Sequence, residues 1–288
     1  MIGMASLDVF ATLFHPAGRG AMSDSVERSV WTVFRKAANW HPPLLRLAGP
    51  VIFLTVISTW VMLYLFGFAL IYDTVIASAF IYAPGLELAK HQSFYDAFNV
   101  SLGSLITVGG DILPKSKFIR LLMGIEAVIG FGLLTASLSA LLSIYPVLEQ
   151  RRSLAHKATL LHTAERTSGV AIFDMPASEL HLQIGELTVE VIVLRNSMSQ
   201  FPVSYYFLSG EKKSSLPGIL EYVRGIAKRA AARPEPEVRL AGAMLGGALK
   251  DYLMLLAEEF LRMPGENLDA VMRAYAHDHM QYLVPYGS

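Results

Sequence analysis

Residues 93–114 read SFYDAFNVSLGSLITVGGDILP, and this stretch decides the fold. Residues 93–106 are mostly apolar or small, and Ser93 followed by Asp96 three residues later suits a helix N-terminus. The length of that helix is about half a membrane crossing. Residues 107–111 then bring two adjacent glycines, which tolerate positive φ. The sequence therefore predicts a short helix followed by a non-helical, glycine-containing segment.

Two charge-free segments flank this stretch. Residues 49–71 and 127–148 contain no Asp, Glu, Lys or Arg, and each is long enough to cross a bilayer as a helix. The alternative is a pair of core helices in a large soluble protein, but only 17% of the chain is charged, less than is usual for soluble domains. Non-helical backbone at membrane depth is tolerated only where protein buries it or where it lines a wet cavity. The order of segments thus predicts a pore loop between two spans.

The chemistry of such a loop lies in its backbone carbonyl groups, which replace the water shell of a cation. The hydroxyl of Thr107 adds a further oxygen ligand. Asp111 is expected either to brace the loop or to place a negative charge at the outer mouth. Glu126, near the start of the second span, is expected to brace the same loop rather than to act as a general base. Beyond a permeant cation, no metal or cofactor is expected.

Residues 93–142 resemble the pore domain of two-transmembrane potassium channels of the bacterial type. The family pattern is Thr-Val-Gly-Tyr-Gly-Asp after the pore helix. Here Thr107, Val108 and Gly109 occupy its first three positions, Gly110 and Asp111 occupy its last two, and the tyrosine is absent. The resemblance implies a selectivity filter made by Thr107, Val108, Gly109 and Gly110, with four copies around one axis. A filter that lacks one carbonyl ring and its aromatic support is expected to favour potassium over sodium only weakly, or to conduct poorly until another conformation is reached.

The second span carries a polar stripe, because Thr135, Ser139 and Ser143 are spaced four apart and share one helix face. A polar stripe in lipid should face protein or water, so these residues are predicted to line the cavity below the filter; helix packing is the alternative. Three residues that weaken or interrupt a helix are candidates for a hinge or gate: Gly130, Gly132 and Pro146.

The rest of the chain is predicted to be helical, with bundle helices at about 147–168, 217–232, 237–263 and 266–284, which makes the fold class mainly α. Residues 1–46 form an N-terminal amphipathic segment at the membrane interface, residues 47–148 the pore domain, and residues 149–288 a helical cytoplasmic domain. Basic residues near the span ends place both termini in the cytoplasm of a cell-membrane protein. A heptad seam marks a buried bundle helix or, less favoured, a subunit interface: Leu180, Ile184, Leu187, Val191, Leu194, Met198 and Phe201.

Several function classes are excluded. The formal net charge is zero, which argues against nucleic acid as a partner, and the chain has no cysteine for thiolate chemistry. No catalytic triad, HExxH or P-loop pattern is present, so an enzyme is not expected. His277 and His279 are two apart and fall on different helix faces, which does not suit a metal site. The sequence predicts a homo-oligomeric cation channel in a lipid bilayer; the alternative is a non-conducting membrane scaffold or sensor that keeps the pore fold.

Overall fold

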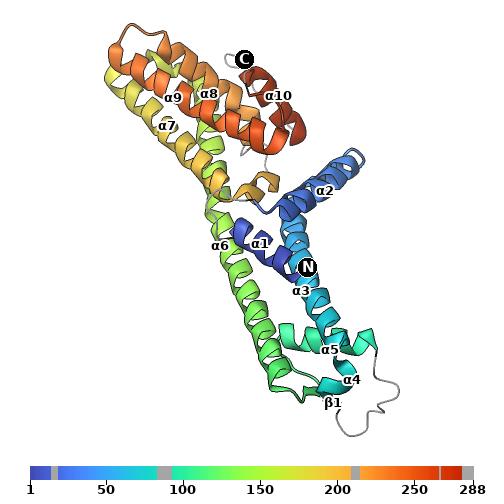
Figure 1. Ribbon diagram of the computed structural model, residues 1–288. Helices are drawn as coiled ribbons and strands as arrows, with labels where there is room; N and C mark the ends of the chain where they lie inside the picture. The colour runs from blue at the N-terminus through green and yellow to red at the C-terminus, as the bar shows by residue number, and fades with distance from the viewer. Residues whose placement is uncertain (14–18, 83–92, 209–214, 266, 281–288) are drawn as a thin grey trace. The chain divides into compact units, whose positions relative to one another are not determined.

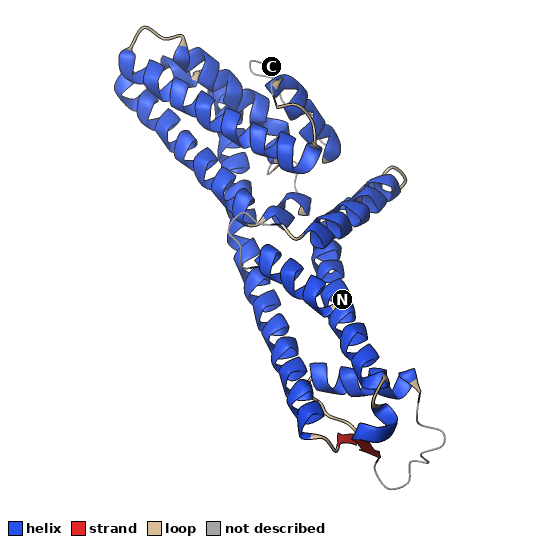
Figure 2. Ribbon diagram, viewed as in Figure 1, coloured by secondary structure: helices blue, strands red, loops and turns tan. Residues whose placement is uncertain are grey.

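The computed structural model describes residues 1–13, 19–82, 93–208, 215–265 and 267–280. The chain divides into two compact units, one of Met1–Ser29 and Ile52–Ser143 and one of Val30–Val51 and Ile144–Ser288. Within the described residues the elements are helices and one two-stranded sheet (Figure 2). The predicted mainly α fold is therefore confirmed, whereas the predicted three-part division of the chain remains a prediction.

The first unit contains the two predicted membrane helices. Helix α3, Ala48–Asp73, follows directly on the 3-10 turn η1, Pro42–Leu47, and α6 begins at Lys117. Both are long and apolar enough to cross a membrane. Only 17% of the most apolar 18-residue stretch of α6 is buried, whereas 39% of the corresponding stretch of α3 is buried. The apolar surface of α6 therefore needs lipid or further protein to cover it.

Helix α5, Phe94–Leu105, is the predicted pore helix, and it crosses between α3 and the first part of α6 (Figure 1). Its N-terminus is capped as the sequence indicates: the backbone N–H of Ser93 donates to Oδ2 of Asp96 at 3.2 Å. Asp96 is buried, and a first-turn carboxylate also complements the helix dipole.

A small sheet joins the segment after α3 to the segment before α6. Strands β1, Phe80–Tyr82, and β2, Ile112–Pro114, pair antiparallel with Ile81 opposite Leu113. The short helix α4, Ile76–Ala79, precedes β1, and the backbone N–H of Lys115 donates to the carbonyl of Ala79 at 2.8 Å. Residues 107–111 are therefore tied at both ends, by α5 before them and by β2 after them.

Helix α6 runs without interruption from Lys117 to Ser168 and contains Pro146. The sequence predicts a separate helix at about residues 147–168 and an inner helix that Pro146 can kink or end; the structure shows one continuous helix instead. A proline removes one backbone N–H and crowds the preceding turn, but α6 passes through it with helical backbone on both sides. The role of Pro146 as a kink or gate remains a prediction.

The second unit is a helical bundle. It contains α7, Ala177–Gln200, α8, Leu216–Ala231, α9, Pro236–Leu255, and α10, Leu268–Asp278, with the shorter turns η3, Ile172–Asp174, η4, Pro202–Tyr206, and the π-helical turn η6, Leu256–Leu261. Helix α9 packs against both α7 and α8, as Figure 1 shows. The sequence predicts this last helix over residues 266–284, but α10 ends at Asp278 and Met280 has a positive φ of 52°; residues 281–284 lie outside the described residues.

The heptad seam of α7 is buried within this bundle. Its members from Leu180 to Met198 are at most 2% exposed, while Phe201, just after the helix, is partly exposed. Leu182 and Val189, off the seam, are 59% and 60% exposed. The favoured interpretation, a buried bundle helix, is therefore the observed one. A groove of about 700 Å³ runs along the opposite side of α7, where Leu182 and Val189 face Leu240 and Met244 of α9.

Asp278 joins the second half of α2 to the bundle; α2 spans Ala21–Ala38. Its carboxylate accepts hydrogen bonds from Trp31 Nε1 at 3.0 Å, from Arg35 at 2.6 Å and from the Tyr205 hydroxyl at 2.6 Å. His279 is buried against the same aromatic rings, and burial, with a smaller contribution from nearby arginines, holds its pKa well below the usual range. The histidine is therefore neutral at pH 7.

A third helical segment, Pro236–Leu261, is also long and apolar enough to cross a membrane. This segment is α9 with η6, which the sequence reading placed in the bundle. Half of its most apolar 18-residue stretch is buried, mainly against α7 and α8. Its hydropathy is accounted for by a central position in the bundle.

Candidate pore loop and its supports

The backbone of residues 107–109 is oriented by one carbonyl of the pore helix. The Gly103 oxygen accepts the N–H groups of both Val108 and Gly109, at 3.0 and 3.1 Å. No peptide bond in the described chain is cis, and in a trans peptide the N–H and the preceding C=O point in opposite directions. The carbonyl groups of Thr107 and Val108 therefore point away from α5.

The next carbonyl points the other way. A Cβ atom built on Gly103 would lie 2.5 Å from the Gly109 oxygen, so this oxygen faces α5. Gly109 has φ of 76°, a conformation that glycine adopts without steric cost. Thr107 also has positive φ, at 60°, which is uncommon for a side chain branched at Cβ. The sequence predicted special dihedrals for the glycines but not for Thr107.

The side of this segment that faces away from α5 is open in a single chain. Residues 107–111 are all exposed, and Val108 is 77% exposed. Within the described part of the chain, Asp111 forms no hydrogen bond or ion pair. The described residues of one copy thus show no bracing contact of Asp111, and both of its predicted roles remain predictions.

Glu126 lies fully buried between three helices of the first unit. Its Oε2 accepts a hydrogen bond from the Tyr72 hydroxyl of α3 at 2.7 Å, and its Oε1 is hydrogen-bonded to the Ser101 hydroxyl of α5. The same Ser101 hydroxyl lies 3.0 Å from the backbone oxygen of Leu65 in α3. Glu126, on α6, is thus in contact with both the pore helix α5 and α3, which is consistent with the predicted brace.

The two predicted hinge glycines of α6 differ in their surroundings. A Cβ on Gly130 would lie 1.9 Å from the backbone oxygen of Leu105, at the end of α5, whereas a Cβ on Gly132 would have nothing within 4 Å. Gly130 therefore permits a close approach of α6 to the last turn of the pore helix. This contact is a packing reason for a glycine, and a hinge at either position remains a prediction.

The predicted cavity stripe lies on an uncovered face of α6. Thr135 and Ser139 are exposed and Ser143 is partly exposed in the single chain. The hydroxyl of Thr135 donates to the Phe131 carbonyl at 2.9 Å, and that of Ser143 to the Ser139 carbonyl at 2.9 Å. These bonds satisfy the donors within the helix and leave oxygen lone pairs on its surface. A cavity-lining role remains a prediction.

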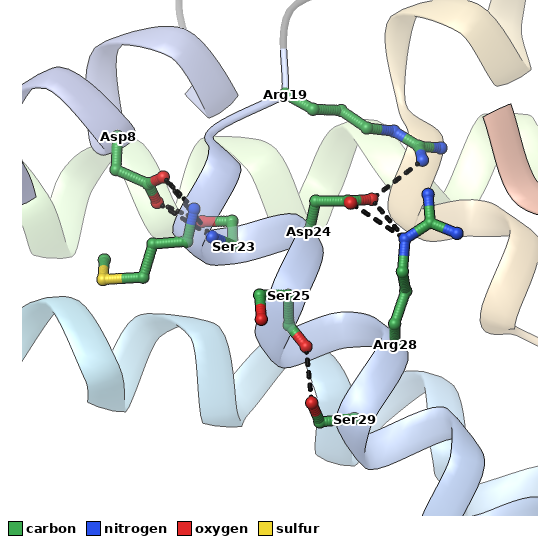
Figure 3. Close-up of polar contacts among 8 residues, drawn as sticks. Asp8, Arg19, Ser23, Asp24, Ser25, Arg28 and Ser29 are labelled. Atoms are coloured by element: carbon green, nitrogen blue, oxygen red, sulfur yellow. Dashed lines mark hydrogen bonds and ion pairs between the residues drawn. The ribbon is translucent and has the colours of Figure 1, made fainter.

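Sequence reasoning missed one polar centre in the first unit, that of Asp8. Asp8 lies within the apolar helix α1, Ile2–Leu13, yet it is only 6% exposed. Trp60 Nε1 of α3 donates to its Oδ2 at 2.8 Å, and the backbone N–H of Met22 donates to its Oδ1 at 2.9 Å. The Ser23 side chain is bonded to the same carboxylate (Figure 3). A single Asp inside an otherwise apolar stretch was the available signal.

This arrangement places a carboxylate at the first turn of α2, where free N–H groups and the helix dipole favour negative charge. Gly20 makes the approach possible, since a Cβ there would lie 2.1 Å from Oδ1 of Asp8. Asp8 therefore connects α1, α2 and α3 through one buried group.

Glu27 is a second buried acid on α2, at 5% exposure. Burial raises its pKa to about 7, although the charge of Arg19 acts in the opposite direction. Its Oε2 has no hydrogen-bond partner among the described residues. Arg19 and Arg28 bind Asp24 instead, at 3.3 and 2.8 Å (Figure 3). Glu27 therefore changes charge near neutral pH.

Within the residues that the structure describes, no group of three or more His, Asp or Glu side chains could hold a metal ion. The oxygen atoms available to a cation in residues 107–110 are those of the backbone and of the Thr107 hydroxyl. The expectation that the protein binds only a permeant cation remains a prediction.

Comparison with known proteins agrees with this geometry. Residues 51–145 match the family model described as an ion channel. Over 216 residues the chain is 24% identical to the "Uncharacterized membrane protein YdjJ" of Bacillus subtilis (strain 168), a match covering 72% of this chain and 60% of that protein. The chain thus spans less than two thirds of that relative. No solved structure matches the chain.

The family match covers both membrane helices up to Tyr145, the pore helix and residues 107–111. It confirms the predicted resemblance to a two-transmembrane channel domain, and it indicates a channel rather than an enzyme. The bacterial type, the shortened filter and the potassium selectivity remain predictions. Residues 51–145 of this chain are similar to the ion channel family.

Proposed function

We propose that several copies of this chain form a cation channel of the potassium-channel type, with residues 107–110 as a short selectivity filter. The observation that carries the proposal is the orientation of two successive carbonyl groups. Those of Thr107 and Val108 point to the same open side because the N–H groups of Val108 and Gly109 are both held by the Gly103 oxygen. Carbonyl groups turned the same way on successive residues are what a dehydrated cation requires.

One copy is insufficient for this function, because two carbonyl groups cannot replace the hydration shell of an ion. The exposure of residues 107–111 in the single chain and the low burial of α6 support assembly about an axis next to this segment. The ion channel family is typically oligomeric in membranes. A tetramer is the proposed assembly, as the four filter loops of potassium channels imply.

The proposed selectivity is weak: potassium passes more readily than sodium, but sodium also passes. A filter discriminates by the size of its cavity or by the number and field strength of its oxygen atoms. This chain lacks one residue of the full pattern, and so one oxygen ring. The proposed location is the cell membrane with both termini in the cytoplasm, in keeping with the basic residues on the outer flanks of the two spans.

The test is a measurement of reversal potentials for the purified full chain in planar bilayers under opposed potassium and sodium gradients. We expect a reversal potential that is displaced slightly from zero toward the potassium equilibrium potential. Thr107→Ala removes one oxygen ligand and should change the permeability ratio, which separates currents of this protein from those of contaminants. A correctly sized oligomer that never conducts would favour the membrane scaffold or sensor. A monomer by mass in mild detergent would contradict the pore itself.

A further inference from the structure

We propose that Gly103 of the pore helix sets the number of oxygen rings that the short filter offers to an ion. This inference rests on the proposed channel function. The carbonyl oxygen of Gly103 fixes the N–H groups of Val108 and Gly109, and the open position on its Cα receives the Gly109 carbonyl. One residue therefore controls the direction of three successive peptide groups in the filter.

The consequence follows from peptide planarity. The Thr107 and Val108 carbonyls point away from α5, whereas the Gly109 carbonyl points toward it, so the chain reverses its peptide orientation at Gly109. Among Thr107, Val108 and Gly109, the oxygen atoms left for an ion are the Thr107 hydroxyl and the carbonyls of Thr107 and Val108. Stacked in an oligomer, these make three rings and two cages between them, and Gly109 adds none.

The position next to the Gly103 Cα exists only because residue 103 has no side chain. The nearest atoms to a Cβ there are the oxygen, carbonyl carbon and Cα of Gly109, at 2.5, 3.1 and 3.7 Å. All three belong to the backbone, so no side-chain rotation relieves the overlap. Gly103 is buried, and the Cβ has no alternative direction because the helix backbone fixes it.

The filter itself can respond to such an overlap. Gly109 and Gly110 both lack a Cβ, so the peptide between them is able to rotate at low steric cost. Nothing lies within 4 Å of a Cβ built on either residue. An alanine at position 103 should therefore turn the Gly109 carbonyl away from α5, to the side of the Thr107 and Val108 carbonyls. The filter then gains one oxygen ring.

The first experiment is a cryo-electron microscopy map of the full-length wild-type oligomer in potassium, at a resolution that shows carbonyl groups. We expect the Gly109 oxygen against Gly103, with ion density only at the levels of Thr107 and Val108. Gly109 carbonyls from all copies converging on an ion would overturn the inference. This result is readable whether or not the protein conducts, so it is independent of the bilayer test of function.

The second experiment compares Gly103→Ala with Gly124→Ala, a helical glycine of α6 whose Cβ would meet nothing within 4 Å. We expect Gly103→Ala to raise the potassium-to-sodium permeability ratio by about threefold or more, roughly 0.7 kcal/mol of preference, and Gly124→Ala to leave it unchanged. An unchanged ratio in Gly103→Ala, in oligomers of normal mass, contradicts the inference. If Gly103→Ala does not assemble, the wild-type map decides alone.

Discussion

The Tyr72 hydroxyl of α3 donates a hydrogen bond to Glu126 of α6 at 2.7 Å, and both residues are fully buried. This bond, with the contact between Glu126 and Ser101, joins the helices on either side of α5. A pore helix held from both sides keeps its C-terminal end, and therefore the Gly103 carbonyl, at a fixed position relative to α6. We therefore expect the position of residues 107–111 to depend on residues far from them in sequence.

Tyr72→Phe is expected to loosen this support. The variant keeps the ring and removes one buried hydrogen bond, at a cost of about 1 kcal/mol. The melting temperature of the oligomer should fall, and the permeability ratio should change because the pore helix is less well held. Tyr145→Phe is the matched control, since Tyr145 of α6 is 62% exposed. Equal behaviour of the two variants would show that the bond to Glu126 does not position the loop.

Asp8→Ala is expected to free the start of α2. The variant removes a capping carboxylate, which costs about 1–2 kcal/mol, and it leaves Trp60 Nε1 without its partner. Hydrogen exchange at residues 20–23 should become faster, while exchange within α10 should not change. Trp60→Phe removes only the indole donor and should give a smaller effect. Trp40→Phe, at a residue that is 92% exposed, is the control. If residues 20–23 exchange as slowly in Asp8→Ala as in the wild type, Asp8 does not cap α2.

The stability of the first unit should depend on pH through Glu27. Its pKa is about 7 in the folded protein, against an ordinary value of 4.5, so the folded state binds more protons than the unfolded state between these values. Stability contributed by this group is therefore full below pH 4.5 and is lost as the pH rises through 7. The upper bound is on the order of 3 kcal/mol, since one pKa unit is worth about 1.4 kcal/mol.

Glu27→Gln removes this titration and should raise the melting temperature at pH 8 more than at pH 5. The measurement is the melting temperature of the wild type and of the variant across that range. Glu149→Gln, at an exposed residue of α6, is the control. It should change the melting temperature by the same amount at pH 5 and at pH 8. If the difference in melting temperature between the wild type and Glu27→Gln does not vary with pH, Glu27 is ionised over the whole range from pH 5 to pH 8.

The bundle of the second unit should be sensitive to the α7 seam and insensitive to the opposite face of the same helix. Leu187 and Leu194 are 2% and 1% exposed, so the double variant with Asp at both positions buries two unpaired charges and should unfold the bundle. Asp at Leu182 and Val189 should leave the helical content unchanged. Circular dichroism and oligomer mass are the measurements. Full helicity in the seam variant would contradict burial of the seam.

The features that the sequence predicted correctly depend on one helix or one short segment. The period of α7 identifies its buried face, the absence of charge identifies α3 and the first part of α6, and Ser93 with Asp96 identifies the start of α5. Each signal is local, so no knowledge of distant contacts is needed. The pore-loop order followed because the three segments are consecutive in the chain.

The features that the sequence did not predict depend on contacts between distant residues. Asp8 stands alone in an apolar stretch of the sequence, and its partners, Trp60 and the first turn of α2, lie on other helices. The direction of the Gly109 carbonyl depends on Gly103 of the preceding helix. The continuity of α6 through Pro146 also had no local signal, since proline alone indicates a break.

The last prediction concerns the residue missing between the two filter glycines. Inserting Tyr between Gly109 and Gly110 adds one peptide unit, and with it one carbonyl group and an aromatic ring. Residues 107–111 are anchored by α5 on one side and by β2 on the other, so the added unit must extend the segment between these anchors. The longer segment should withdraw the Gly109 carbonyl from Gly103 and add oxygen rings to the ion path, which raises the preference for potassium over sodium.

Inserting Gly instead of Tyr separates the effect of segment length from that of the aromatic side chain. The glycine insertion should give part of the increase in potassium preference. The measurement is the permeability ratio of each variant in oligomers of normal mass. A wild-type protein that is already strongly selective for potassium would show that the oxygen atoms of Thr107 and Val108 suffice, and the proposal that filter length limits selectivity would then be wrong.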